Sequence, residues 1–119
     1  MISARFPRRA RLTKPEDYKS VFAEATRATV GCLTLLARRN QLDHPRLGLA
    51  ISKKHAKSAV ARNLIKRATR ESFRLLQHQL CGVDVVVLTR PGVTKLSRAQ
   101  LQTALATLWS KTIERCKKS

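Results

Sequence analysis

The chain has 119 residues, of which 43% are hydrophobic, so it suits one compact domain with a real core. It carries 25 Lys and Arg against 7 Asp and Glu, a formal net charge of +18. Such a chain repels itself when compact, which favours a polyanionic partner, with nucleic acid ahead of an anionic membrane surface. No stretch approaches the roughly 18 consecutive apolar residues of a membrane-spanning helix.

The first eleven residues contain four arginines and no acid. We predict that residues 1–11 form a flexible basic arm, with a short transit peptide as the alternative. An apolar run is missing, which excludes a secretory signal.

The cysteines and histidines are scattered through the chain: Cys32, Cys81, Cys116, His44, His55 and His78. This spacing predicts neither a disulfide framework nor a zinc site. It is typical of a reducing compartment, so we expect a cytoplasmic protein.

The first helix is expected from Pro15 to about Ala25, because proline and two following acids suit a helix start. Two strands are predicted next, over Val30–Ala37 and Arg46–Ser52, and we expect them to pair as a hairpin around the turn at residues 40–45.

A long helix over residues 57–80 and a buried strand over Val83–Thr89 follow. Ser97 and Gln100 have the spacing of a capping box, so a last helix is predicted from there to about Cys116. Its apolar side holds Leu101, Leu105, Leu108 and Trp109. The order α, β, β, α, β, α predicts an α+β fold, a two-layer sandwich of a small sheet and packed helices in a single domain over residues 1–119.

Residues 57–80 separate into two halves when they are placed on a helix at about 100° per residue. The apolar half, expected to pack on the sheet, contains Val60, Ala61, Leu64, Ile65, Ala68, Leu75 and Leu76. The basic half, expected to face outward, contains Arg62, Asn63, Lys66, Arg67, Arg70 and Arg74.

Four cations of the basic half follow one another at i, i+4 spacing, so like charges lie above one another at a cost of roughly a few tenths of a kcal/mol per pair. Glu71 is the only acid in the segment. Phosphates between the cations would offset this repulsion, and arginine binds phosphate oxygens in a bidentate way. A solvated charged face is the alternative, but the purity of sign favours nucleic acid.

Tyr18 and Phe22 form an i, i+4 aromatic pair on the first helix. The pattern alone favours a core role, with stacking on unpaired bases as the alternative. Lys53 and Lys54 extend the basic surface near the start of the long helix. The sequence contains no nucleophile triad, carboxylate cluster or glycine-rich phosphate loop, so we predict no catalytic residue and no metal ligand.

Two runs, RLGLAISKK at residues 46–54 and AVARNLIKRATRESFR at residues 59–74, resemble the protein component of bacterial ribonuclease P. The pattern R-N-x-x-K-R-x-x-R-E at residues 62–71 is that family's signature. The resemblance covers most of the chain, and residues 67–79 look closest to gammaproteobacterial members.

The resemblance implies a left-handed βαβ crossover and a fourth strand. It also implies a subunit of an endoribonuclease, a ribonucleoprotein that removes the 5′ leader of precursor tRNA and matures the tRNA 5′ end. The RNA subunit, with bound Mg²⁺, would do the chemistry. The implied partners are the catalytic RNA and precursor tRNA, and we expect no membrane and no obligate protein partner.

Carried over to matching positions, the resemblance implies contacts to the catalytic RNA from Arg62, Asn63, Lys66, Arg67 and Arg70, and the i, i+4 spacing adds Arg74. It implies a leader-binding cleft with Tyr18, Phe22, Lys53 and Lys54. Two departures from the family pattern concern Leu35 and Leu36, where many members carry an aromatic residue, and residues 56–58, where many carry glycine.

Three other functions compete with this interpretation. A ribosomal protein or RNA chaperone would share the charge without needing the aromatic pair. A protein-only nuclease would need the carboxylates that the sequence lacks, and a DNA-binding protein would prefer duplex DNA.

Overall fold

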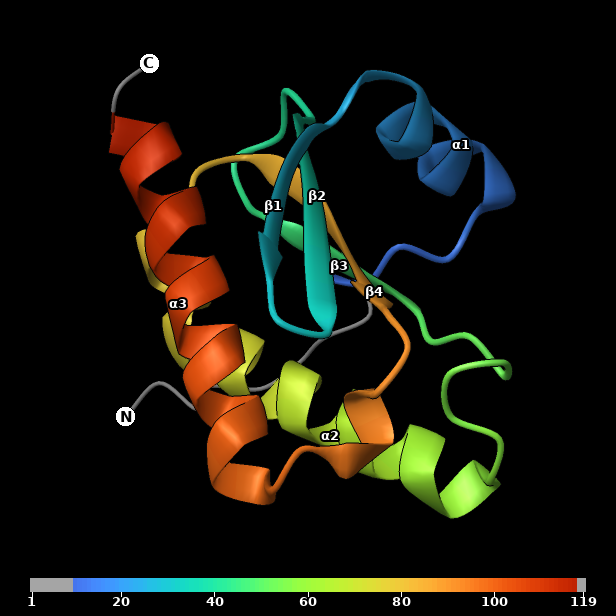
Figure 1. The fold of residues 1–119 in the computed structure, drawn as a ribbon. Helices are drawn as coiled ribbons and strands as arrows, with labels where there is room; N and C mark the ends of the chain where they lie inside the picture. The colour runs from blue at the N-terminus through green and yellow to red at the C-terminus, as the bar shows by residue number, and fades with distance from the viewer. Residues whose placement is uncertain (1–9, 118–119) are drawn as a thin grey trace.

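Figure 1 shows the computed structural model, which describes residues 10–117. The described elements, in chain order, are α1 Pro15–Glu24, β1 Thr26–Val30, β2 Leu33–Arg39, β3 Arg46–Ala50, α2 Ala59–Leu76, η2 Gln77–Gln79, β4 Val83–Thr89, η3 Val93–Lys95 and α3 Arg98–Lys117. All three predicted helices and the predicted Val83–Thr89 strand are confirmed. Residues 1–9 of the predicted arm lie outside the described residues. Of its last two residues, Ala10 is buried in the main core, and Arg11 forms an isolated bridge with Leu47 of β3.

The strands form one mixed sheet in the order β1-β2-β4-β3. β1 pairs antiparallel with β2, and β2 pairs antiparallel with β4. β3 pairs parallel with β4, so α2 is the helix of the βαβ crossover that the resemblance implies. The left hand of that crossover stays a prediction, whereas the predicted α+β fold with a small mixed sheet is confirmed.

The predicted hairpin between Val30–Ala37 and Arg46–Ser52 is wrong. β4 lies between β2 and β3, and its residues Val83–Val87 are all buried. A strand that is apolar on both faces buries the most apolar surface when it lies in the middle of a sheet. β4 therefore lies beside β2, in the place that β3, which is nearer to β2 in sequence, was predicted to take. β1, the implied fourth strand, gave no apolar pattern because only Ala28 in it is buried.

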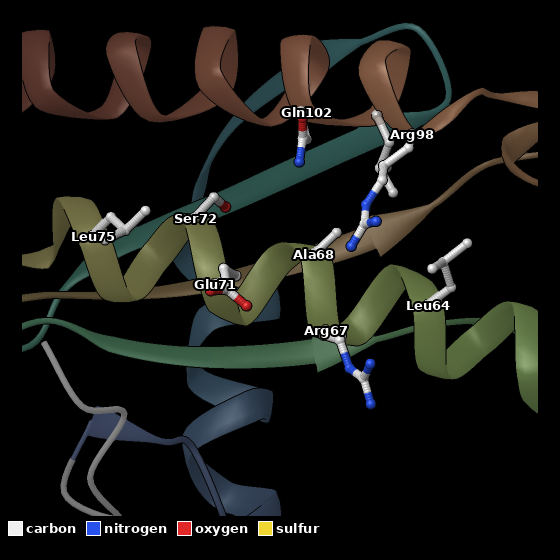
Figure 2. A pocket seen from close by; sticks show the side chains of 9 residues that line it. Leu64, Arg67, Ala68, Glu71, Ser72, Leu75, Arg98 and Gln102 are labelled. Carbon is white, nitrogen blue, oxygen red and sulfur yellow. The ribbon is translucent and has the colours of Figure 1, made fainter.

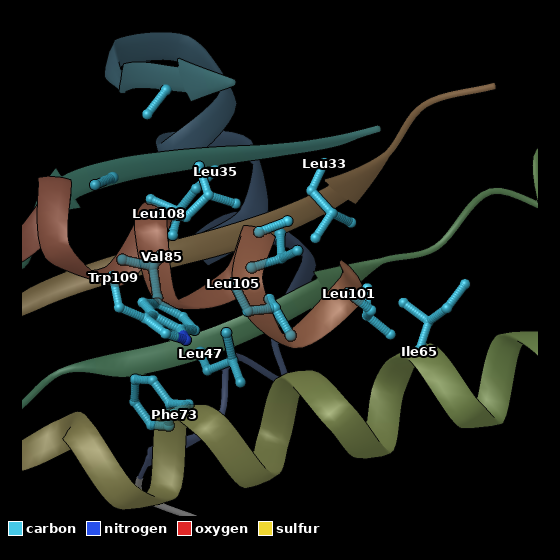
Figure 3. Close-up of a cluster of buried hydrophobic side chains, with 14 of the residues drawn as sticks. Leu33, Leu35, Leu47, Ile65, Phe73, Val85, Leu101, Leu105, Leu108 and Trp109 are labelled. Carbon is cyan, nitrogen blue, oxygen red and sulfur yellow. The ribbon is translucent and has the colours of Figure 1, made fainter. Parts of the chain in front are cut away.

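The main core lies between one face of the sheet and helices α2 and α3 (Figure 3). The four residues predicted for the apolar side of α3 are all buried. Phe73 of α2 meets Trp109 of α3 with ring centroids 5.7 Å apart, and the indole N–H donates to Ser72 Oγ at 2.8 Å. This pair fixes the two helices against each other.

Helix α1 packs on the other face of the sheet (Figure 1). Val21, which is fully buried, joins Leu12, Leu36 and Val86 in a second, smaller cluster. Successive residues of a strand point to opposite faces, so Val85 and Val87 serve the main core while Val86 holds α1.

Serine residues cap the N-terminal ends of helices α2 and α3. Ser58 Oγ accepts from Ala61 N at 3.0 Å at the start of α2. The predicted capping box is confirmed, because Ser97 N donates to Gln100 Oε1 at 2.8 Å and Gln100 N donates to Ser97 Oγ at 3.1 Å. These bonds satisfy N–H groups that a helix start leaves without partners.

The prediction that the whole apolar half of α2 packs on the sheet is only partly right. Ile65 is buried, but the residues that continue its stripe are Thr69 and Phe73. Val60 is 80% exposed, and Leu64 and Leu75 remain 50% and 55% exposed and lie beside α3 (Figure 2). Thr69 is tolerated in the core because its hydroxyl donates to Ile65 O at 2.8 Å. α2 therefore buries a narrow stripe in the angle between α3 and the sheet.

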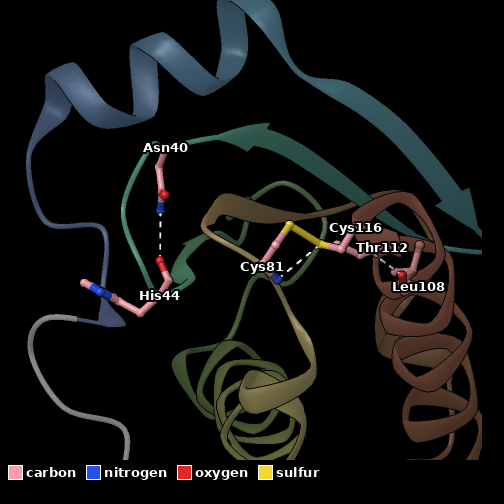
Figure 4. Close-up of a disulfide and its surroundings, with 6 residues drawn as sticks. All are labelled: Asn40, His44, Cys81, Leu108, Thr112 and Cys116. Carbon is pink, nitrogen blue, oxygen red and sulfur yellow. Dashed lines mark hydrogen bonds between the residues drawn. A yellow bond between two sulfur atoms is a disulfide. The ribbon is translucent and has the colours of Figure 1, made fainter. Parts of the chain in front are cut away.

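The expectation of no disulfide is also wrong. Cys81 and Cys116 form a disulfide with Cα atoms 5.7 Å apart, which joins the start of β4 to the C-terminal end of α3 (Figure 4). The two cysteines are 35 residues apart in sequence, and α3 returns along the sheet to bring them together. Cys32 is a free thiol.

A buried ion pair links the edge strand β3 to β4. Arg46 donates to Asp84 from Nε at 2.8 Å and from Nη2 at 2.6 Å, and Asn40 Nδ2 donates to the same carboxylate at 2.8 Å. Arg46 also reaches Asp17 of α1 at 3.4 Å. The hydrogen bond to Asp84 raises the pKa of Arg46, against the opposing effect of its partial burial.

We expect Arg46→Met to lower the free energy of unfolding by roughly 3 kcal/mol, because it leaves the Asp84 carboxylate buried without its charge partner. Urea denaturation measures this loss. Arg38→Met is the control, since Arg38 lies 3.5 Å from Glu24 in a pair whose side chains are 37% and 72% exposed, and it should cost less than about 1 kcal/mol. Equal losses in both variants would contradict the prediction.

Candidate nucleic-acid interface

The outward arc of α2 carries the predicted RNA-binding cations. Asn63, Arg67 and Arg70 are exposed, and Lys66 is half-buried beside them. Lys66 and Arg70 also line a cavity of about 240 Å³ whose other walls come from the segment before α1, from Tyr18 and from β3. The basic arc of α2 is therefore the surface formed by Asn63, Lys66, Arg67 and Arg70, and it reaches the cavity at the N-terminal end of α1.

Arg62 holds the loop that precedes α2 and also contributes to the basic surface. Its Nη1 donates to Ala56 O at 3.0 Å and to Lys57 O at 2.8 Å, in the loop that precedes α2. The opposite end of the row also has a partner, because Arg74 Nη2 donates to Glu71 Oε1 at 2.9 Å. The side chains of this second pair are 34% and 58% exposed, so the ion pair adds little stability in water.

Tyr18 is fixed by three contacts at the foot of α1. Its hydroxyl donates to Leu12 O at 3.2 Å and accepts from Leu49 N at 3.3 Å. Its ring lies over Gly48 of β3, where a Cβ atom would meet Tyr18 Cε1 at 2.7 Å. Phe22, one turn later, is 50% exposed. The two aromatic residues therefore differ: Tyr18 is part of the architecture, and Phe22 offers a free ring surface.

Lys53 and Lys54 are exposed in the turn that follows β3. Ser52 holds this turn, since its Oγ accepts from Lys54 N at 3.1 Å and its own N–H donates to Thr89 Oγ1 at 3.1 Å. Neither lysine lines the cavity beside Tyr18, and neither does Phe22. This cavity thus brings Tyr18 together with Lys66 and Arg70, whereas Phe22, one turn further along α1, and the two lysines lie outside it.

Arg11 is a further cation at this cavity that the sequence reasoning did not select. Arg11 belongs to the arginine-rich start of the chain, and the composition of that run predicts a flexible arm and not a binding site. The bridge to Leu47 fixes its backbone at the edge of the sheet instead.

Across residues 10–117, no three His, Cys, Asp or Glu side chains gather where they could bind a metal ion. Among the helices described, none has the length and hydropathy needed to span a bilayer.

Comparison with known proteins identifies the family to which this sequence and fold belong. The sequence matches the Ribonuclease P family over residues 6–113. The chain belongs to the Ribonuclease P family. The Ribonuclease P protein component of Pectobacterium atrosepticum is 49% identical over 109 residues, 92% of each chain. That of Haemophilus influenzae is 44% identical over 119 residues, all of both chains.

Solved structures of Ribonuclease P proteins share the fold. The Staphylococcus aureus protein superposes with a TM-score of 0.80 at 28% identity, over 86% of this chain and 94% of that one. The Thermotoga maritima protein gives a TM-score of 0.75 at 27% identity, over 85% and 96% of the two chains. The resemblance carried by residues 46–54 and 59–74 is confirmed.

We expect Gly48→Ala to lower the free energy of unfolding by about 1–3 kcal/mol, because the added methyl group displaces a tyrosine ring that two hydrogen bonds hold in place. Chemical denaturation measures the effect. In a Tyr18→Ala background the same glycine substitution should cost less, since the clashing ring is gone and the remaining close contact, with Leu12 Cδ1 at 2.9 Å, is with the end of a flexible side chain. A cost that is independent of residue 18 would show that the ring does not require the glycine.

Proposed function

We propose that this chain is the protein subunit of a Ribonuclease P ribonucleoprotein, which binds the catalytic RNA and the 5′ leader of precursor tRNA while the leader is removed. One observation carries the proposal beyond family membership. The signature residues on α2 form an outward basic arc that continues into the Tyr18 cavity. A single surface thus offers cations both to a folded RNA and to a strand at the foot of α1.

The two regions of this surface suit two kinds of RNA contact. The basic arc of α2 faces away from the protein core and suits the phosphates of the catalytic RNA. It consists of Asn63, Lys66, Arg67 and Arg70. Arg62 supports this surface by holding the loop before α2, and Arg74 extends it. On α1, the exposed ring of Phe22 suits an unpaired leader base, and Lys53 and Lys54 offer positive charge from the turn after β3.

The chemistry is assigned to the RNA subunit, which would hold Mg²⁺ and supply the metal-bound groups that cleavage requires. The role of this chain is electrostatic. With a net charge of +18 it lowers the phosphate repulsion between the catalytic RNA and its substrate. We assign no catalytic residue to the protein, and we place the complex in the cytoplasm.

A cleavage assay with labelled precursor tRNA at low Mg²⁺ tests the proposal. Protein alone, catalytic RNA alone and both together are compared. Efficient cutting at the mature 5′ end only in the combination is the expected result. Cutting by protein alone would favour a protein-only nuclease, and no effect of added protein would favour a general RNA-binding protein.

Arg67→Ala should weaken binding to the catalytic RNA and reduce the slope of log affinity against log salt by about 0.7–0.9, the value for one lost phosphate contact. Filter binding across a salt series measures both quantities. The control is Lys111→Ala, which removes one exposed positive charge from α3 and should leave the slope nearly unchanged. An identical slope in wild type and Arg67→Ala would count against the assigned contact.

Phe22→Ala should weaken binding of precursor tRNA to the assembled ribonucleoprotein by about tenfold, since stacking on one base contributes about 1–3 kcal/mol. Binding of mature tRNA, which lacks the leader, should not change. Leu42→Ala is the matched control, because Leu42 is 44% exposed in the loop before β3. Equal losses for both tRNA species would remove Phe22 from the leader site.

A further inference from the structure

A groove between α2 and α3 has no assigned role in the proposed function. It has a volume of about 450 Å³, within the range of roughly 300–1,000 Å³ that is typical of small-molecule sites. Its apolar surface comes from Leu64, Ala68 and Leu75 of α2 and from Leu101 of α3. Leu64 and Leu75 are half exposed, so a folded chain of this size leaves two large apolar side chains in water along one groove.

Cations and an amide lie around this apolar surface. Arg98 and Gln102 point from α3 toward α2, as Figure 2 shows, and Arg67 lies at the rim beside Ala68. The carboxylate of Glu71 at the same rim is paired with Arg74. A ligand that fits all of these groups is apolar and flat at one end, carries hydrogen-bonding edges, and is anionic at the other end.

We propose that this groove binds one unpaired nucleotide of the catalytic RNA. The base lies against Leu64, Ala68 and Leu75, its edge meets the Gln102 amide, and a neighbouring phosphate meets Arg98, while Arg67, which points away from α3 in Figure 2, serves the next phosphate on the side of the basic arc. Proteins stack unpaired bases on aromatic rings and arginine planes, and they also hold extruded bases between apolar side chains such as those of this groove. This inference rests on the proposed function and adds α3 to the RNA interface.

The charge of the molecule argues for RNA over a second copy of the chain. Two copies at +18 each repel one another, and the groove is flanked by Arg67 and Arg98, which add to that repulsion. A polynucleotide brings the opposite charge to the same place. Arg67 stands between the groove and the basic arc of α2, so one RNA segment can cross from phosphate contacts into the groove.

Leu64→Ala and Leu75→Ala test the base contact without changing any charge. Each should lower the affinity of the full-length protein for the catalytic RNA by about tenfold, with the salt slope unchanged. Leu42→Ala, an exposed leucine outside the groove, should bind like wild type. Thermal unfolding should shift by a similar, small amount in all three variants, because each of the three side chains is about half exposed.

Arg98→Ala tests the phosphate contact, and it should weaken binding and reduce the salt slope by nearly one unit, whereas Lys111→Ala should not. Chemical probing of the bound RNA should then show an unpaired nucleotide that wild-type protein protects and Leu75→Ala leaves reactive.

Three outcomes would overturn the inference. Leucine variants that bind the RNA like Leu42→Ala would overturn the groove alone, and the proposed function would stand. Self-association in sedimentation that Leu75→Ala abolishes, with RNA binding intact, would assign the groove to a second copy. A wild-type protein that does not bind the catalytic RNA would overturn the proposed function and the groove together.

Discussion

The buried pair of Arg46 and Asp84 sets the geometry on which the rest of the molecule depends. β3 lies at the edge of the sheet, and in the described part of the chain β4 is the one strand that pairs with it. The bidentate contact fixes the parallel register of these strands, and its extensions to Asn40 and Asp17 bring the loop before β3 and the start of α1 to the same point. A charge pair can do this because each member would be costly to bury alone.

That register determines where the basic surface lies. α2 must connect β3 to the parallel strand β4, so it crosses one face of the sheet, where Phe73 and Trp109 attach it to α3. Ile65, Thr69 and Phe73 turn inward. The basic arc is thereby presented on the side of α1 and the exposed leucines on the side of α3. Two different chemical surfaces follow from one narrow buried stripe, and Arg67 lies between them.

Local patterns predicted the three helices and three of the four strands, but they missed β1 and could not predict how distant segments pair. The proline and acids of α1, the capping box of α3 and the valine run of β4 act within a few residues, so the sequence displays them. The β2–β4 pairing and the Cys81–Cys116 disulfide join distant segments that no local pattern relates. The signature helix identified the basic residues, but helical periodicity could not show that Leu64 and Leu75 stay in water or that Arg62 holds a loop. Arg11 was missed because its backbone bridge to Leu47 has no sequence signal.

The outer side of β3 shows how the start of the chain protects the sheet. An edge strand with unpaired N–H and C=O groups is a template for pairing with another molecule. Here Leu12 N donates to Leu47 O at 2.9 Å, and the Tyr18 hydroxyl accepts from Leu49 N. A short main-chain segment and one phenol thus occupy hydrogen-bonding groups that a foreign strand would otherwise use. Tyr18 therefore closes part of the sheet edge at which a strand of another molecule could pair.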